Sequence, residues 1–199
     1  TLFPYTTLFR SHFDVEGRRH PACLFVGIVG DTATARKGTS WALVRRVFEH
    51  ADDLWVRERI RNGVVSGEGL FRALCEPEDG SPGDRRLFLQ EGELAKLLAT
   101  GKRQGNTATV YLRDAWDGEP LYRLASGEQT CARGYHLSCA FHVTHADLDA
   151  HLSALDLANG FANRIAFVVV RRVRVLPLGG RVDEATLDEL GRRIRAAIG

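Results

Sequence analysis

Small residues, a lysine and two hydroxyls follow the first apolar run of the chain. The run covers residues 23–29, and residues 30–40 (GDTATARKGTS) separate it from a segment with helical spacing of apolar residues. A loop of small residues that leads into a helix exposes backbone N–H groups, which can bind phosphate oxygens together with the helix N-terminus. Lys37 would then neutralise the terminal phosphates, and the hydroxyl of Thr39 or Ser40 would bind Mg²⁺. The candidate phosphate-binding residues are Gly30, Asp31, Thr32, Arg36, Lys37, Gly38, Thr39 and Ser40.

The spacing resembles a phosphate-binding P-loop but departs from its strict pattern, GxxxxGK[ST]. Position 35 is Ala35 rather than glycine, and Gly38 separates Lys37 from Thr39. The loop would therefore close in a modified register. A glycine- and threonine-rich turn, with Ser40 capping the following helix, explains the same residues without any ligand. Local spacing alone does not decide between the two interpretations.

Acidic residues follow a later apolar run. Residues 86–90 (RLFLQ) are followed by Glu91 and Glu93. An ATPase needs an acidic side chain at the tip of a second strand, to hold Mg²⁺ and to position the attacking water. We expect Glu91 in the metal shell and Glu93 as the base or water-positioning residue, although the two roles could be exchanged. The alternative is that both are first-turn residues, which the helix dipole favours.

Two further residues fit an ATPase site. Thr144 follows the apolar run 135–143, where a polar side chain could sense the γ-phosphate; it is equally placed to cap a helix. Arg164 stands directly before the apolar run 165–170. An arginine there could stabilise transition-state charge, either in cis or across a subunit interface. A solvated surface arginine is the alternative.

The predicted elements that would position these residues alternate along the chain. Short apolar runs predict strands, and apolar residues at helical spacing predict the helices between them. This alternation indicates an α/β fold with a mainly parallel sheet flanked by helices, in which ligands bind beyond the carboxyl ends of the strands. The predicted strands cover residues 23–29, 64–65, 86–90, 135–143 and 165–170, and the predicted helices cover 41–55, 94–98, 107–116, 147–157 and 182–198, with a pattern that allows a β-hairpin between 118 and 134.

Five motifs occur in one order that resembles a known family. They are VGDTATARKGTSW (29–41), SGEGL (66–70), LFLQEGELAKLL (87–98), GNTATVYLRDAWDG (105–118) and LANGFANRIAFVVVRR (157–172). Together they resemble a bacterial and phage P-loop ATPase family of uncharacterised function, whose members are associated with primases and helicases of mobile elements. The resemblance covers about residues 20–180. It implies a RecA/AAA-like core that uses ATP and Mg²⁺, with the strand 135–143 inserted between the phosphate-loop strand and the acidic strand. Ala35 replaces a glycine of the family.

The first eleven residues (TLFPYTTLFRS) resemble the translation of a sequencing adapter, and the chain contains no methionine. We therefore expect a non-native segment at 1–11. A short native strand with Pro4 at its edge is the alternative. The remaining residues 12–199 are then expected to be a P-loop ATPase core truncated at the N-terminus and, because family members continue further, at the C-terminus.

Composition bounds the class of protein. The 199 residues carry 27 Lys+Arg against 25 Asp+Glu, a formal charge of +2, which by itself does not predict nucleic-acid binding. No apolar run approaches the ~20 residues that span a bilayer, so we expect no membrane association. The four cysteines show no CxxC spacing, which favours a reduced, cytoplasmic protein. Cys131, Cys139, His142 and His145 could be imagined as a zinc set, but Cys139, His142 and His145 fall on or just after one predicted strand, where alternation separates their directions.

These features predict a Mg²⁺-dependent ATP-binding and ATP-hydrolysing domain in a DNA replication protein, associated with a primase or helicase of a mobile element. The alternative is a nucleotide-binding assembly or regulatory module with little or no hydrolysis. DNA contact is expected through domains outside this chain, and a ring of copies could use Arg164 in trans. Solvation explains the basic positions more simply than nucleic-acid contact, and they are Lys102, Arg103, Arg171, Arg172 and Arg174. For Trp116, core packing is favoured over substrate contact.

Overall fold

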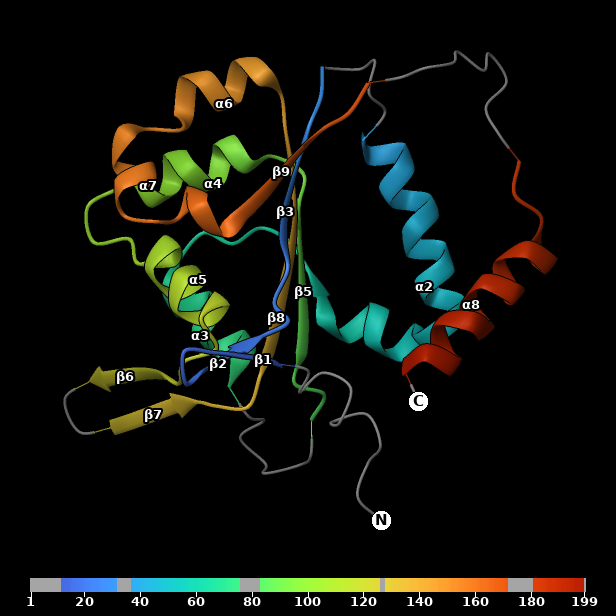
Figure 1. Ribbon diagram of the computed structural model, residues 1–199, viewed down its shortest axis with the longest axis horizontal. Helices are drawn as coiled ribbons and strands as arrows, with labels where there is room; N and C mark the ends of the chain where they lie inside the picture. The colour runs from blue at the N-terminus through green and yellow to red at the C-terminus, as the bar shows by residue number, and fades with distance from the viewer. Residues whose placement is uncertain (1–11, 32–36, 76–82, 126–127, 172–180, 199) are drawn as a thin grey trace.

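The computed structural model describes residues 12–31, 37–75, 83–125, 128–171 and 181–198. It is a mixed α/β structure in which helices cover both faces of a parallel sheet (Figure 1). The predicted α/β fold with a mainly parallel sheet is therefore confirmed. Among the described residues, no helix combines the length and the apolar character needed to cross a membrane.

The central sheet has five strands in the order β4-β5-β8-β3-β9, and all neighbouring strands are parallel. The strand β8 lies between β3 and β5, so the inserted position that the family resemblance implied is confirmed. In register, Val29 of β3 pairs with Val143 of β8 and with Val169 of β9, which aligns the carboxyl ends of these strands. The strands are β3 (Phe25–Val29), β4 (Ile60–Arg61), β5 (Arg86–Glu91), β8 (His136–Val143) and β9 (Ile165–Val169).

Helices form two unequal layers on the sheet (Figure 1). One face carries α2 (Lys37–Arg59) and α8 (Glu184–Ile198). The opposite face carries α3 (Gly67–Leu74), α4 (Leu94–Gly101), α5 (Ala108–Trp116), α6 (His145–His151), α7 (Ala154–Ala158) and the 3-10 turn η1 (Ala162–Arg164). Two antiparallel hairpins lie near the amino ends of the sheet strands and pair β1 (His12–Val15) with β2 (Arg18–Pro21) and β6 (Leu121–Ala125) with β7 (Glu128–Ala132).

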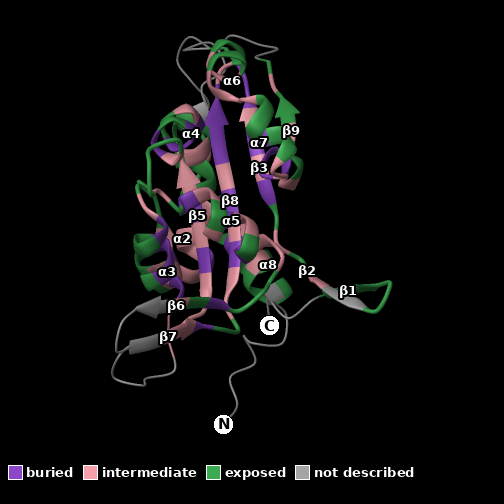
Figure 2. Ribbon diagram, turned by 90° about the vertical axis from the view of Figure 1, so that its left-hand side faces the viewer, coloured by how far each residue is buried: buried purple, intermediate pink, exposed green. Residues whose placement is uncertain are grey.

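The main hydrophobic core lies between the sheet and the layer that contains α3, α4 and α5. Every second residue of β8 points into it, and Leu137, Cys139, Phe141 and Val143 are all at most 3% exposed. Figure 2, viewed from this side, shows buried residues running along β8 and β3 beneath the helices. The alternating residues of the central strands, which face α2, are only half-buried, except for the buried His142. The two faces of one sheet are therefore packed to different degrees.

Several predicted boundaries differ from those observed. The helix expected over 41–55 extends over Lys37–Arg59, and Asp52 interrupts it with non-helical backbone angles (φ −155°, ψ 81°). The strand expected at 64–65 is instead the two-residue β4, directly after α2. The helix expected over 147–157 is two helices, because Ser153 starts α7 with a capping box shared with Asp156. The hairpin allowed by the pattern between 118 and 134 is present as β6 and β7.

Candidate functional site

The predicted phosphate loop starts at the carboxyl edge of the sheet. Gly30 follows β3 and is buried, and its N–H donates to the carbonyl of Val143 at 3.1 Å. The N–H of Val170 donates to the carbonyl of Val29 at 2.8 Å, so three strand ends are joined at this edge. Asp31 comes next and is exposed. The predicted residues Thr32, Ala35 and Arg36 lie outside the described residues.

The helix α2 begins directly after that loop, at Lys37, and has 23 residues. Gly38, Thr39 and Ser40 form its first turn and are exposed. The first N–H groups of a helix have no intrahelical acceptor and carry the positive end of the helix dipole. No acidic residue stands in the first turn of α2, whose backbone is fully described, so a bound anion would meet no fixed negative charge there. The side chain of Lys37 lies outside what the structure describes.

Glu91 ends β5 and uses its carboxylate to hold the loop that follows β4. Its Oε1 accepts the N–H of Val64 at 2.8 Å. Burial raises the pKa of Glu91, and the N–H groups of Val64 and Gly63 together with the Lys96 charge offset part of that rise. Gly63 has a φ of +77°, a conformation that favours glycine. Glu91 is therefore at the expected strand tip, with one carboxylate oxygen already engaged by protein.

Glu93 lies two residues further, at the position that precedes α4. Its side chain is exposed and makes no capping hydrogen bond to the helix. The backbone carbonyl of Glu93 accepts the N–H of Lys96 at 3.1 Å. Glu93 thus presents a carboxylate to solvent at the same edge of the sheet as Glu91.

Thr144 follows β8 at this same edge, next to the carbonyl that Gly30 binds. It caps α6: its Oγ1 accepts the N–H of Asp147 at 3.0 Å and donates to Asp147 Oδ2 at 2.7 Å. The capping interpretation therefore accounts for its hydroxyl. A γ-phosphate sensor would have to exchange the Asp147 bond for a phosphate bond.

Arg164 lies at the opposite edge of the sheet. It precedes β9, and the adjacent Ile165 pairs with Phe25 at the start of β3. At about 3.3 Å per residue, the five residues of β9 place Arg164 roughly 16 Å from the carboxyl edge. Its Nη2 bonds Asp117 Oδ2 at 2.6 Å and its Nη1 donates to the carbonyl of Gly160 at 3.0 Å. The structure does not bring Arg164 together with the acidic residues of the site.

The Arg164 guanidinium also lies over the Trp116 ring, 5.4 Å from its centroid. The WDG and NGFANR motifs therefore contact each other. Gly118 has a φ of +73°, and a Cβ there would lie 2.6 Å from the ring of Pro21. Trp116 packs against the core, as favoured from the sequence. These residues join α5 to the start of β9, a contact that the linear sequence does not reveal because 47 positions separate Asp117 from Arg164.

The SGEGL and GNTA motifs meet at the carboxyl edge of the sheet, a contact that reasoning from the sequence missed. Asn106 donates through Nδ2 to the carbonyl of Val65 at 2.8 Å and accepts the N–H of Ala108 through Oδ1 at 2.8 Å. Ser66 caps α3 by accepting the N–H of Gly69 at 3.1 Å. Glu91 and Asn106 thus hold the loop 62–66 from two sides. The signal was present in the SGEGL and GNTA motifs, but their spacing does not show that they meet.

Other predictions find simpler structural explanations. Among the described residues, no group of three or more His, Cys, Asp or Glu side chains could hold a metal ion. Lys102 donates to the backbone carbonyl of His151 at 2.6 Å, and Arg103 and Arg171 are exposed. Arg172 and Arg174 lie outside the described residues.

A scan against family models and a search of curated proteins give no match to this sequence.

Proposed function

We propose that residues 12–199 form an ATP-binding P-loop domain of RecA/AAA-like plan that hydrolyses ATP with Mg²⁺. One observation carries the proposal: the loop start, the first turn of α2 and the acidic end of β5 are gathered at the carboxyl edge of one parallel sheet. Ligands of open α/β sheets bind at this edge. The position of β8 between β3 and β5 supports the same plan.

The residues present suit a nucleotide with a hard cation. The N-terminus of α2 would bind phosphate oxygens, and Lys37 would neutralise the terminal phosphates. Mg²⁺ prefers oxygen ligands and keeps several waters, so it needs few protein groups. The exposed hydroxyls of Thr39 and Ser40 and the carboxylate of Glu91 supply such oxygens. When bound, the cation would neutralise charge that develops on the phosphates.

The two acidic residues are given different roles by their surroundings. Glu91 is tied to the Val64 N–H, so its placement depends on the loop 62–66. Glu93 is exposed and makes no capping hydrogen bond, so it can position a water. We therefore assign Glu91 to the metal shell and Glu93 to the attacking water. Arg164 is left out of the site in cis, because it lies at the opposite edge and is bound to Asp117.

A second function is a nucleotide-binding assembly or regulatory module that does not hydrolyse ATP. It is favoured by the engagement of Glu91 Oε1 with the loop backbone and of the Thr144 hydroxyl with Asp147. A role beside a primase or helicase of a mobile element, with DNA bound by other domains, follows from the family resemblance. A ring of copies that uses Arg164 in trans would first have to break its bond to Asp117.

Titration with a fluorescent ATP analogue and measurement of phosphate release test the proposal. We expect Lys37→Ala to weaken nucleotide binding about tenfold or more, which corresponds to roughly 1.4 kcal/mol. Lys102→Ala is the matched control, since the Lys102 ammonium only bonds a backbone carbonyl. Glu93→Gln should keep binding and lose hydrolysis. Binding without phosphate release by the unaltered protein would favour the second function, and no binding at all would refute both.

A further inference from the structure

A cavity of about 860 Å³ lies between the sheet and α2. Protein interiors are close-packed, and voids much larger than a water molecule are few. Pockets that bind small organic molecules measure roughly 300–1,000 Å³. The cavity is thus far larger than a packing defect and lies in the range of a ligand site. It is separate from the core between the sheet and the other helical layer, and the inference drawn from it does not depend on the proposed nucleotide site.

The sequence of β8 explains why this space is open. The residues of β8 that face the main core are large or tightly packed, whereas those facing α2 include Ser138 and Ala140 in the middle of the strand. A central parallel strand normally carries branched apolar residues on both faces. Here α8 does not fill the gap, because it packs mainly on α2, and among its described side chains Ile194 alone lines the cavity.

The polar contacts between the two helices keep α8 in that position. Arg46 pairs with Glu184 at 2.5 Å, and His50 Nδ1 lies 2.6 Å from Asp188 Oδ1. Arg195 donates to the carbonyl of Ala51 at 3.0 Å. The helix α8 is therefore anchored along α2 rather than against the strands, and it leaves the sheet face below α2 only partly covered.

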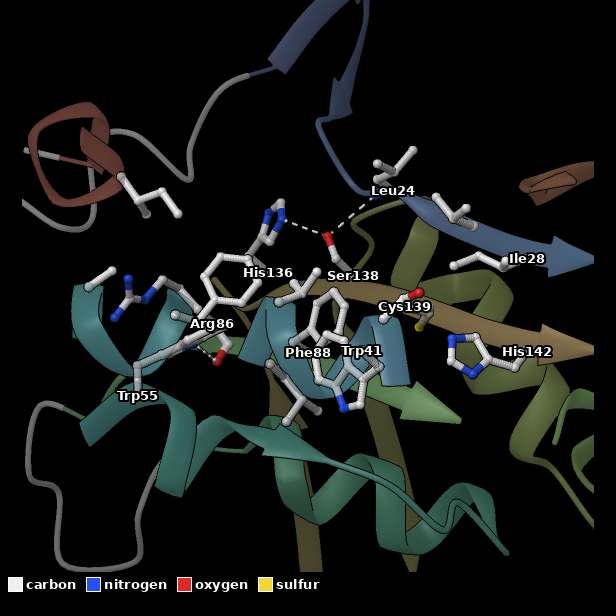
Figure 3. A pocket seen from close by; sticks show the side chains of 18 of the residues that line it. Leu24, Ile28, Trp41, Trp55, Arg86, Phe88, His136, Ser138, Cys139 and His142 are labelled. Atoms are coloured by element: carbon white, nitrogen blue, oxygen red, sulfur yellow. Dashed lines mark hydrogen bonds between the residues drawn. The ribbon is translucent and has the colours of Figure 1, made fainter. Parts of the chain in front are cut away.

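Aromatic rings form the wall on the α2 side (Figure 3). Trp41 stacks on Phe88 of β5, with ring centroids 5.5 Å apart and an interplanar angle of 12°. Trp55 meets Phe88 edge-on at 6.4 Å, and Phe48 meets Trp55 at 5.7 Å. The opposite wall is the sheet itself, with Val26 among its apolar residues. Flat aromatic surfaces of this kind favour flat aromatic partners.

Four polar side chains of the lining form two pairs, Ser138 with His136 and Arg86 with Asp52. Ser138 Oγ accepts the N–H of Leu24 at 3.4 Å and lies 3.2 Å from His136 Nε2 (Figure 3). The Arg86 guanidinium binds Asp52 at 2.8 Å and also pairs with Asp84. A buried ligand charge would need a partner of its own, since an isolated ion in an apolar site is strongly disfavoured. These paired groups offer none in the interior, and the other polar residues of the lining are the buried His142 and, on the exposed side, Ser40 and Arg171.

The cavity is open to solvent along one side. Two lining residues, Leu24 and Val44, are 58% and 44% exposed. A ligand could therefore enter without unfolding α2. From the volume, the aromatic walls and the paired charges, we propose that this cavity binds an uncharged, flat aromatic small molecule between the sheet and α2.

The uncharged fluorophore N-phenyl-1-naphthylamine is a direct probe. We expect saturable binding of one molecule per chain, with an increase in its fluorescence and quenching of tryptophan emission, because Trp41 and Trp55 line the cavity. The sulfonate analogue 8-anilinonaphthalene-1-sulfonate carries a similar ring system and a charge, and it should bind at least tenfold more weakly. Equal or tighter binding of the sulfonate would overturn the assignment to uncharged ligands.

Variants locate the bound probe. Ala140→Leu fills the floor of the cavity and should weaken probe binding at least tenfold, while Ala150→Leu places the same change on exposed α6, on the other face of the sheet, and should bind as the unaltered protein does. Val44→Phe narrows the cavity from the half-exposed side of α2 and decides the question if circular dichroism shows that Ala140→Leu does not fold. Unchanged binding in a folded variant of either cavity residue, or no saturable binding by the unaltered protein, refutes the proposal.

Discussion

Removal of the Asp117 carboxylate should destabilise the fold through its contact with Arg164. The pair is at 2.6 Å, and the two side chains are 31% and 24% exposed, so it lies between a surface pair and a buried one. Exposed pairs contribute about 0–1 kcal/mol, and breaking a buried pair costs about 3–5 kcal/mol. We therefore expect Asp117→Ala to lower the free energy of unfolding by about 2 kcal/mol, and the melting temperature by about 4–8 °C for a chain of this length.

A double-mutant cycle separates this pair from its surroundings. Arg164→Met keeps an apolar side chain over the Trp116 ring while removing the charge. Chemical denaturation of Asp117→Ala, Arg164→Met and the double variant should give a coupling energy of about 1–2 kcal/mol, since the residues are in direct contact. Glu189→Ala is the control, because its partner Arg192 is 72% exposed, and a loss below about 0.5 kcal/mol is expected. A coupling energy below about 0.5 kcal/mol, the loss expected for the control substitution, would refute the reasoning.

Two further predictions concern the loop 62–66 at the carboxyl edge and Gly67, the first residue of α3, which follows it. A Cβ at Gly67 would lie 2.2 Å from Thr107 Oγ1 and 2.3 Å from the Tyr111 ring, so Gly67→Ala should lower the free energy of unfolding by about 1–3 kcal/mol. Gly92→Ala, where a Cβ meets nothing within 4 Å, is the control in the same denaturation assay, and equal losses in both would contradict the packing argument. Burial raises the pKa of Glu91. Between about pH 4, where the unfolded state loses this proton, and the higher pKa of the folded state, the folded state still holds it. The free energy of unfolding therefore falls as the pH rises through this window. Glu91→Gln keeps an acceptor for the Val64 N–H but carries no charge. The free energy of unfolding of this variant, relative to that of the unaltered protein, should therefore increase over the same pH window. A difference in denaturation midpoint that does not change with pH would disprove this prediction.

The sequence was sufficient for the α/β class because its signal is local. The apolar runs at β3, β5, β8 and β9 and the periodic segments between them set strand and helix without reference to contacts. The position of β8 between β3 and β5 could not be predicted from local patterns in this way, because hydrophobic periodicity does not encode the order of strands in a sheet. It came from the resemblance of the motifs to a family, and the sheet agrees with it.

Arg164 shows what residue type and spacing leave undetermined. From its residue type and its place before a strand, Arg164 is expected to stabilise transition-state charge in cis or across a subunit interface, with a solvated arginine as the alternative. The direction of the strand determines where Arg164 lies. In a parallel sheet, a residue that precedes a strand lies at the amino edge. The same topological rule separates Thr144, which follows β8, from Arg164, which precedes β9. To place a candidate site residue at one edge of a parallel sheet, whether it precedes or follows its strand matters as much as its residue type.

The helix α2 connects the two sites that the structure suggests. Its first turn, with Ser40, belongs to the proposed phosphate site, and the residue that follows, Trp41, stacks on Phe88 in the wall of the cavity. A ligand that displaced this ring would act on the turn proposed to hold phosphate, whereas the main core on the other face of the sheet does not include α2. Binding at the two sites is then coupled in both directions by the same factor, as thermodynamic linkage requires. Titration of the ATP analogue in the presence of saturating N-phenyl-1-naphthylamine measures that factor, and a value of one would show that α2 transmits nothing between them.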